Sequence, residues 1–223
     1  MLRCRKAWAG GDARPLLLDV TDAASIAAAA LAIAAVDVLV NNAGISGENE
    51  TPDRVDTDTF RRVYETNVFG TAAVTNAFLP ALRRSAHPRI VNVSSGTGSL
   101  TWAVGAQFPH LGSYAAYRSA KTALNALTVF YAHALADDGI KVNASAPGLR
   151  RTNLNVNAAA SDGDPAEAAA GSAGPAAGRR PVRQVPVLRR HRGSVVARRG
   201  VQSGPRDQMR CAEPAFVRRR GLR

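Results

Sequence analysis

The sequence predicts an α/β fold, a doubly wound parallel sheet of the Rossmann-like type. Short apolar runs of strand length alternate with longer segments that have helical composition or helical periodicity. Polar residues follow directly where several of the apolar runs end, and in a parallel sheet the ligand crevice lies beyond those strand ends. With 46% hydrophobic residues, the chain can form one α/β domain with a sizeable core.

The first elements predicted along the chain are a strand, a helix and a second strand. Residues 14–20 are a short apolar run that ends in an acid, which is typical of a buried parallel strand. Residues 23–35 are almost all Ala, Ile and Leu, and they follow a Thr-Asp pair that offers a helix cap. Residues 36–41 then give another buried strand, so this part of the chain is a βαβ unit.

The alternation continues over the next hundred residues. Residues 57–84 place apolar side chains near helical spacing, and residues 89–94 form a third strand. A helix over 113–136 and a strand over 140–145 follow. From residue 164, an Asp cap and a Pro start one more helix, which a Gly-rich stretch interrupts within a turn or two.

The charge distribution divides the chain at about residue 170. Residues 1–170 hold 15 basic and 15 acidic side chains, whereas residues 171–223 hold 14 arginines, no lysine and two acids. The tail therefore supplies the whole net charge of +12. Gly and Pro make up 12 of its 53 residues and hydrophobic periodicity is absent, so we expect a partial domain over 1–170 and a disordered Arg/Gly/Pro-rich tail over 171–223.

Several classes of protein are disfavoured by composition. Cys4 and Cys211 lie at opposite ends of the chain, so neither a disulfide framework nor a metal site is indicated. No apolar stretch approaches 18 residues without a charge, and the first residues lack an apolar signal core. We expect a cytoplasmic protein with no membrane partner and no specific nucleic-acid partner.

Tyr117 and Lys121 are four residues apart, which on a helix places both side chains on one face. A nearby ammonium group favours phenolate, and so lowers a phenol pKa that is near 10 in water. Alone, this pair also fits an ordinary surface helix. Further motifs come at strand ends or within a helix: Asn41-Asn42-Ala43-Gly44, Asn67, Ser94-Ser95 and Pro147-Gly148. Serines after strands are also ordinary caps and turns.

These motifs, in this order, resemble the short-chain dehydrogenase/reductase family over roughly residues 13–170. The resemblance implies an NAD(P)-dependent oxidoreductase that transfers a hydride between a carbonyl and an alcohol. It implies that Tyr117 is the general acid/base, that Lys121 lowers its pKa and binds the nicotinamide ribose, and that Ser95 stabilises the developing alkoxide. Asn67 would position a water that extends the proton path from Lys121.

The resemblance also implies a dinucleotide site, a substrate class and an assembly. The cofactor is NADP or NAD, the substrate is a small carbonyl or alcohol, and family members usually form homo-oligomers. Residues carried over to the cofactor site are, besides Tyr117 and Lys121, Asp19, Asn41, Asn42, Ala43, Gly44, Pro147, Gly148 and Thr152.

One interval resembles carbonyl-reductase-like members in particular. Tyr117 follows Ser95 by 22 residues, longer than the dozen or so common in the family, and the interval contains Trp102 and Phe108. We expect this loop to form an apolar wall for the substrate. The alternative is a loop that merely packs on its own domain.

The sequence departs from the family at both ends. The family opens with a strand and a Thr-Gly-x-x-x-Gly-x-Gly turn that receives the pyrophosphate, and this sequence has no such turn. We therefore expect a Rossmann-like domain that is incomplete at both ends, in which strand 14–20 is separated from strand 36–41 by a two-strand gap and lacks partners. The subunit-contact elements of the family would be lost as well. The alternative function is an inactive truncated fragment whose basic tail binds polyanions nonspecifically.

Overall fold

The structure, a computed structural model, describes residues 16–104, 112–172, 190–191 and 194–195. The chain divides into two compact units, residues 1–187 and residues 188–223. In the second unit, β4 (Arg190–His191) pairs with β5 (Ser194–Val195) as a short antiparallel ladder. We expect disorder over 171–223, and most of these residues lie outside the described ranges. The described ones are the last two residues of helix α7 and the strands β4 and β5.

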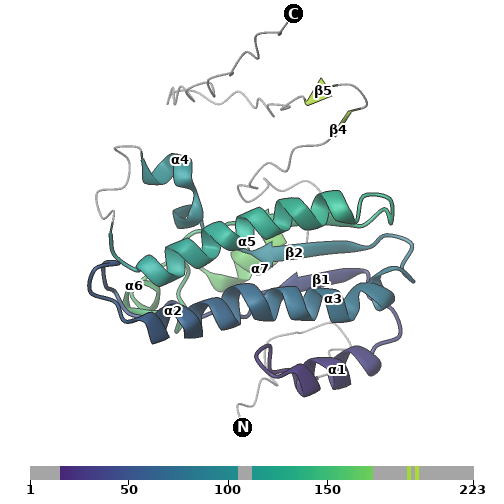
Figure 1. Ribbon diagram of the computed structural model, residues 1–223, viewed down its shortest axis with the longest axis horizontal. Coiled ribbons are helices and arrows are strands. Elements are labelled where there is room, and N and C mark those ends of the chain that lie inside the picture. The colour runs from purple at the N-terminus through teal and green to yellow at the C-terminus, as the bar shows by residue number, and fades with distance from the viewer. Residues whose placement is uncertain (1–15, 105–111, 173–189, 192–193, 196–223) are drawn as a thin grey trace, which may run out of the picture. The chain divides into compact units, whose positions relative to one another are not determined.

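The first unit is a parallel three-stranded sheet with helices, which confirms the predicted α/β fold class (Figure 1). The strands are β1 (Val38–Asn41), β2 (Arg89–Val93) and β3 (Lys141–Ser145), hydrogen-bonded in that order. The helices are α1 (Ala23–Leu31), α2 (Thr57–Tyr64), α3 (Thr71–Leu82), α4 (Leu100–Ala103), α5 (Ala115–Ala134), α6 (Val156–Ala159) and α7 (Pro165–Ser172), with a π-helical segment, η1 (Glu65–Gly70), and a 3-10 turn, η2 (Gly96–Gly98).

Local sequence signals explain where several helices begin. The carboxylates of Asp22 and Asp56 accept hydrogen bonds from backbone N–H groups of the first turns of α1 and α2. Asp164 does the same for α7, which the structure describes as far as Ser172. The predicted helix over 57–84 is one run of α2, η1 and α3, and the π-helical segment in its middle carries Asn67.

The predicted strand over 14–20 is wrong for residues 16–20, which form a loop and a turn. The side chain of Leu17 is 90% exposed, and the backbone N–H of Asp19 donates to the Ser25 hydroxyl rather than to a strand. A strand needs a paired neighbour for its backbone groups. Among the described residues, β1 pairs with β2 alone, so no neighbouring strand is present to pair with residues 16–20.

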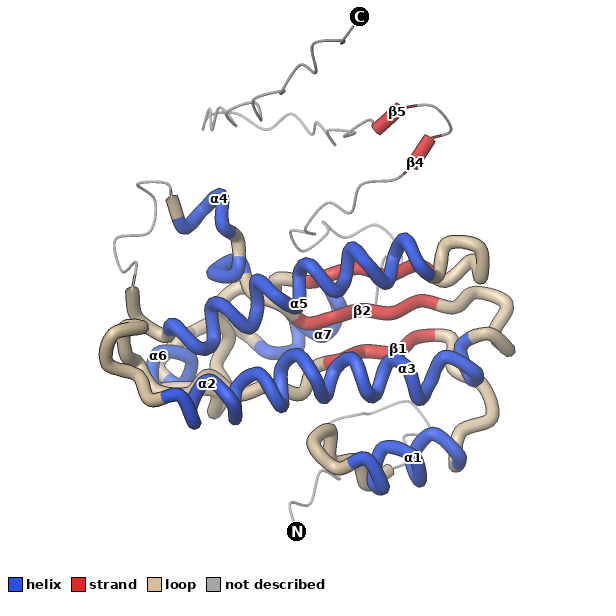
Figure 2. The backbone as a smooth tube through the Cα atoms, viewed as in Figure 1, coloured by secondary structure: helices blue, strands red, loops and turns tan. Residues whose placement is uncertain are grey.

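Helices α3 and α5 lie side by side along the strands (Figure 2). Ile90 and Val142 of the sheet pack with Leu82 at the end of α3 and Leu135 after α5. A second apolar cluster joins α1 to α3, and a third joins α2 and η1 to the first two turns of α5. The last cluster fixes the part of α5 that carries the candidate site.

A chain of buried polar side chains crosses the layers below that site. The Asn41 Nδ2 atom donates to the Thr75 hydroxyl at 3.0 Å and to Asn92 Oδ1 at 2.8 Å, and Asn92 Nδ2 donates to the Thr128 hydroxyl at 2.9 Å. All four side chains are buried. The chain ties α3, β1, β2 and α5 together, and buried groups of this kind are costly to leave unpaired.

We expect Asn92→Ala to lower the free energy of unfolding by about 3 kcal/mol, because it opens space in the core and removes the partner of two buried groups. Urea unfolding of the two proteins measures this difference. Asn76→Ala is the matched control, since the Asn76 amide is exposed and accepts from the Tyr131 hydroxyl. Equal losses in both variants would contradict the role given to the buried chain.

Candidate active site

Tyr117, Lys121 and Ser95 come together beside the carboxyl end of β2. Tyr117 and Lys121 lie one turn apart on α5, with Lys121 Nζ 5.6 Å from the centre of the Tyr117 ring. Ser95 follows β2 and precedes η2, and its hydroxyl lies near enough to the Tyr117 phenol to lower the pKa of that phenol. The helical spacing and the strand-end position thus bring together three of the residues expected from the sequence.

The two adjacent serines have different environments. Ser94 is buried, and its hydroxyl donates to Asn125 Oδ1 at 2.6 Å. Ser95 is less buried, has an extended backbone, and its hydroxyl also contacts the Thr97 hydroxyl at 2.8 Å. Neighbouring side chains of an extended segment point to opposite sides. The Ser95 hydroxyl is therefore the one available beside Tyr117.

Lys121 is almost fully buried, with 4% of its surface exposed. Its Nζ atom donates to the Val93 carbonyl at 2.7 Å, which ties α5 to the end of β2. Burial lowers the pKa of Lys121 from 10.5 to about 8, because the charged form loses its hydration. This leaves two N–H donors of the ammonium group for other partners.

The lowered pKa of Lys121 has a consequence for stability. Between pH 8 and 10.5 the unfolded chain binds more protons at this position than the folded chain, so stability rises with pH there. From pH 7 to 9.5 the free energy of unfolding should rise by about 2 kcal/mol more in the wild-type chain than in Lys121→Met. Urea unfolding at both pH values tests this. Lys141→Met, at an exposed position of β3, should behave as wild type, and a rise that survives in Lys121→Met would contradict the assignment.

Tyr117 departs from the expectation that its pKa is lowered. Burial raises the pKa of Tyr117, and the nearby Ser95 hydroxyl counteracts part of this effect. The Lys121 ammonium lies over the Tyr117 ring and donates to the Val93 carbonyl. Desolvation destabilises the charged forms of both Tyr117 and Lys121. At neutral pH Tyr117 is therefore protonated, the form that can donate a proton.

Asn67 joins η1 to the loop after β1. Its side-chain amide is fully buried, accepts from the Ile45 N–H at 2.9 Å and donates to the Ile45 carbonyl at 2.8 Å. A Cβ atom on Gly44 would lie 3.2 Å from Asn67 Oδ1 and 3.6 Å from Lys121 Nζ. The backbone at Gly44 therefore passes close to both residues, and a side chain there would crowd them.

The residues proposed from the sequence to line the cofactor have different surroundings. The Asn41 side chain is turned into the core, where it bonds to Thr75 and Asn92, while Asn42 and Ala43 are exposed. Only the backbone of Asn41 is thus left to face a ligand.

Asp19 lies in the loop before α1. Its carboxylate accepts from the N–H and hydroxyl of Thr21, which lower its pKa. It lines an open hollow of about 610 Å³ together with Leu16, Leu17 and Ser25. Both of these hydrogen bonds to the Asp19 carboxylate thus come from a residue two positions further along the chain.

Pro147, Gly148 and Thr152 lie in the loop after β3. Gly148 has a φ of +77°, a backbone conformation that favours glycine, and Thr152 is exposed. The Ser46 hydroxyl donates to the Leu154 carbonyl at 2.9 Å, which ties this loop to the loop after β1. Two of the segments expected at the cofactor site are thus joined directly.

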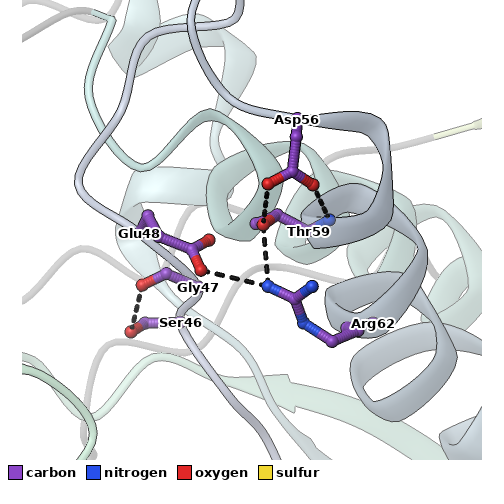
Figure 3. A network of polar contacts seen from close by, with 6 residues as sticks. All are labelled: Ser46, Gly47, Glu48, Asp56, Thr59 and Arg62. Carbon is purple, nitrogen blue, oxygen red and sulfur yellow. Dashed lines mark hydrogen bonds and ion pairs between the residues drawn. The ribbon is translucent and has the colours of Figure 1, made fainter.

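The loop after β1 is held by a polar network that the sequence patterns did not reveal (Figure 3). Arg62 donates to Glu48 at 3.0 Å and to the Thr59 hydroxyl at 2.8 Å, and Thr59 is in turn bonded to Asp56. The Glu50 carbonyl accepts from the N–H of Ala115 at the start of α5. The network thus braces the loop near the N-terminus of the helix that carries Tyr117.

The expected apolar wall falls partly outside the described residues, since Phe108 lies among residues 105–111. Trp102, on α4, packs over Gly96, where an added Cβ atom would come within 2.4 Å of the ring. Trp102 therefore covers the residue next to Ser95. Within the described ranges, no cluster of three or more His, Cys, Asp or Glu side chains could hold a metal ion, and none of the helices is long and apolar enough to cross a membrane.

Ser95, Tyr117 and Lys121 are thus gathered beside the carboxyl end of a parallel strand, where open α/β sheets bind their ligands. The family model described as short chain dehydrogenase matches residues 3–163. The chain therefore belongs to the short-chain dehydrogenase family, a family of oxidoreductases.

Individual relatives agree with this assignment. The chain is 38% identical over 153 residues to the "Short-chain dehydrogenase anuI" of Penicillium roqueforti, which covers 63% of this chain and 59% of that protein. Among solved structures, it is similar to an NADPH-bound carbonyl reductase from chicken fatty liver, with a TM-score of 0.56 and 34% identity over 62% of this chain and 59% of that one. An NAD+-bound xylitol dehydrogenase gives a TM-score of 0.52 and 32% identity over 59% and 49% of the two chains. The chain thus spans less than two thirds of the length of each of these proteins.

Proposed function

We propose that residues 1–170 form a dinucleotide-binding domain that transfers a hydride between a small carbonyl and an alcohol, with Tyr117 as the general acid/base. The observation that carries this proposal is that Tyr117 lies with Lys121 Nζ 5.6 Å from its ring centre, beside the buried Lys121 and near enough to Ser95 for the Ser95 hydroxyl to lower the Tyr117 pKa. A Tyr–Ser pair of this kind offers two hydroxyl groups to one substrate oxygen.

In the direction of reduction, the Tyr117 phenol donates its proton to the carbonyl oxygen. Its raised pKa keeps that proton in place at neutral pH until the oxygen becomes basic. The Ser95 hydroxyl donates a hydrogen bond to the same oxygen and stabilises its developing negative charge. In the direction of oxidation, Tyr117 accepts the proton back. When bound, NADPH or NADH supplies the hydride.

The chain's own residues fit the nicotinamide half of such a cofactor. Lys121 has two N–H donors left for ribose hydroxyls, and the absence of a side chain at Gly44 keeps the space beside Lys121 open. Further candidates for the cofactor site are Asp19, Asn42, Ala43, Pro147, Gly148 and Thr152. Both NADP and NAD remain candidates, since the similar structures include an NADPH-bound and an NAD+-bound protein.

Asn67 completes the proposed proton path. Its side-chain amide is hydrogen-bonded to the backbone of Ile45. Its backbone carbonyl oxygen accepts from the Thr71 hydroxyl at 3.1 Å. A carbonyl oxygen has two lone pairs. We assign the second one to a water that passes protons between Lys121 and solvent.

The test is an assay of the purified chain with a panel of aldehydes and ketones, followed by the loss of NADPH or NADH absorbance. Cofactor is supplied at millimolar concentration, because no residue of this chain matches the glycine turn that receives the pyrophosphate in the family. We expect slow oxidation of cofactor that depends on the carbonyl and on Tyr117. Cofactor oxidation that is the same in Tyr117→Phe, or none at all, would favour the inactive fragment.

A further inference from the structure

The loop that carries Ser95 is fastened to α5 on both sides of Ser95. On one side, the hydroxyl of the buried Ser94 donates to Asn125 Oδ1 at 2.6 Å. On the other side, the Gly98 carbonyl accepts from Asn125 Nδ2 at 3.3 Å. A single amide group therefore binds residues 94 and 98, and Ser95 lies between them.

Two further contacts hold the far end of this loop against the helix. The Thr122 hydroxyl donates to the same Gly98 carbonyl at 2.9 Å. A Cβ atom on Gly98 would lie 2.7 Å from the carbonyl carbon of Lys121, so the loop and the helix meet at backbone contact. Any loosening of the loop therefore moves Ser95 relative to Tyr117, which stands on the preceding turn of the same helix.

We propose that Asn125 is a positioning residue for the reaction, holding the Ser95 hydroxyl beside the Tyr117 phenol. The amide suits this purpose at position 125, because its oxygen accepts from Ser94 while its nitrogen donates to Gly98. Asn125 makes no contact with the reacting atoms and acts through the loop. This inference rests on the proposed function of Tyr117 and Ser95.

The test compares Asn125→Leu, whose side chain has a similar volume and no polar atoms, with the control variant Ser119→Ala. Ser119 lies on the same helix, and its hydroxyl bonds only to backbone carbonyls one turn earlier. In turnover assays, Asn125→Leu should lower kcat by about 10-fold or more and change the carbonyl KM less than twofold, since a small misplacement affects the reacting geometry before it affects binding. Ser119→Ala should match the wild type in both constants.

A second readout does not depend on turnover. With tyrosine labelled by 13C at Cζ, an NMR titration follows the pKa of Tyr117, whose signal is assigned with Tyr117→Phe. The nearby Ser95 hydroxyl lowers this pKa, so Ser95→Ala should raise the titration midpoint. Asn125→Leu should raise it in the same way, while Lys121, the charged group next to the ring, is unchanged in all variants.

The outcomes separate the inference from the proposed function. If Asn125→Leu folds and leaves the Tyr117 midpoint at the wild-type value while Ser95→Ala shifts it, the positioning role is wrong. If both variants shift the midpoint but the wild-type chain shows no Tyr117-dependent turnover, the positioning holds and the proposed function fails. Should Asn125→Leu not fold, Ser94→Ala removes one of the two fastenings by deleting a single hydroxyl, and the same shift is expected.

Discussion

Tyr117→Phe is expected to lower kcat/KM for carbonyl reduction by at least about 100-fold, the scale of removing a general acid. The phenol lies near Ser95, and burial raises its pKa and so keeps its proton in place at neutral pH. Phenylalanine keeps the ring and its packing but has no proton to give. The ratio of the two kcat/KM values is measured from initial rates at millimolar cofactor and at carbonyl concentrations below saturation.

Tyr131→Phe provides a matched control for this substitution. Tyr131 stands on the same helix, and its hydroxyl donates to Asn76 on α3 rather than into the site. The control should keep its rate within about twofold, since the Tyr131 ring keeps its packing and the lost hydroxyl bonds to Asn76 rather than to a residue of the site. A Tyr117→Phe variant that kept more than a tenth of wild-type kcat/KM would exclude Tyr117 as the proton donor.

The second large effect concerns cofactor binding. We expect the purified chain to show no saturable binding of NADPH or NADH at micromolar concentrations. A dinucleotide carries two phosphate charges, which this fold normally meets with the amides of a glycine turn and a helix N-terminus. No residue of this chain matches that turn, and the arginines of residues 171–223 can offer only an attraction that salt screens.

Titration of the chain with NADPH, followed by cofactor fluorescence at low and at physiological salt, checks this expectation. Lys121→Ala is the informative variant, because Lys121 is the residue proposed to hold the ribose. Saturable binding that persists at physiological salt and weakens in Lys121→Ala would show that the nicotinamide half of the site suffices. The importance that we give to the glycine turn would then be wrong.

The sequence predicted most of the local structure around the site. The spacing of Tyr117 and Lys121 correctly placed both on one helix, because helical geometry depends on neighbours along the chain. The strand that ends before Ser94 was predicted to within one residue. The error came at residues 16–20, where an apolar run suggested a strand, because strand formation depends on a partner that a single run cannot reveal.

The contacts across the site could not be read from the sequence. Asn41 belongs to a recognisable motif, yet its amide lies in the core with Thr75 and Asn92, which are distant in the chain. Asn125 carries no motif at all, and its importance appears only when α5 meets the loop after β2. Such contacts depend on the register between elements, and a sequence pattern specifies the elements better than their register.

The most direct test of the central claim is to follow the hydride itself. The chain is incubated at millimolar concentration of NADPH that carries deuterium at both C4 positions of the nicotinamide, together with a carbonyl substrate. The alcohol is examined by mass spectrometry and NMR. The proposed function predicts one deuterium on the carbinol carbon, formed by the wild-type chain and by Tyr131→Phe and at least about 100-fold more slowly by Tyr117→Phe. No labelled alcohol from the wild-type chain, or equal labelling by Tyr117→Phe, would contradict it.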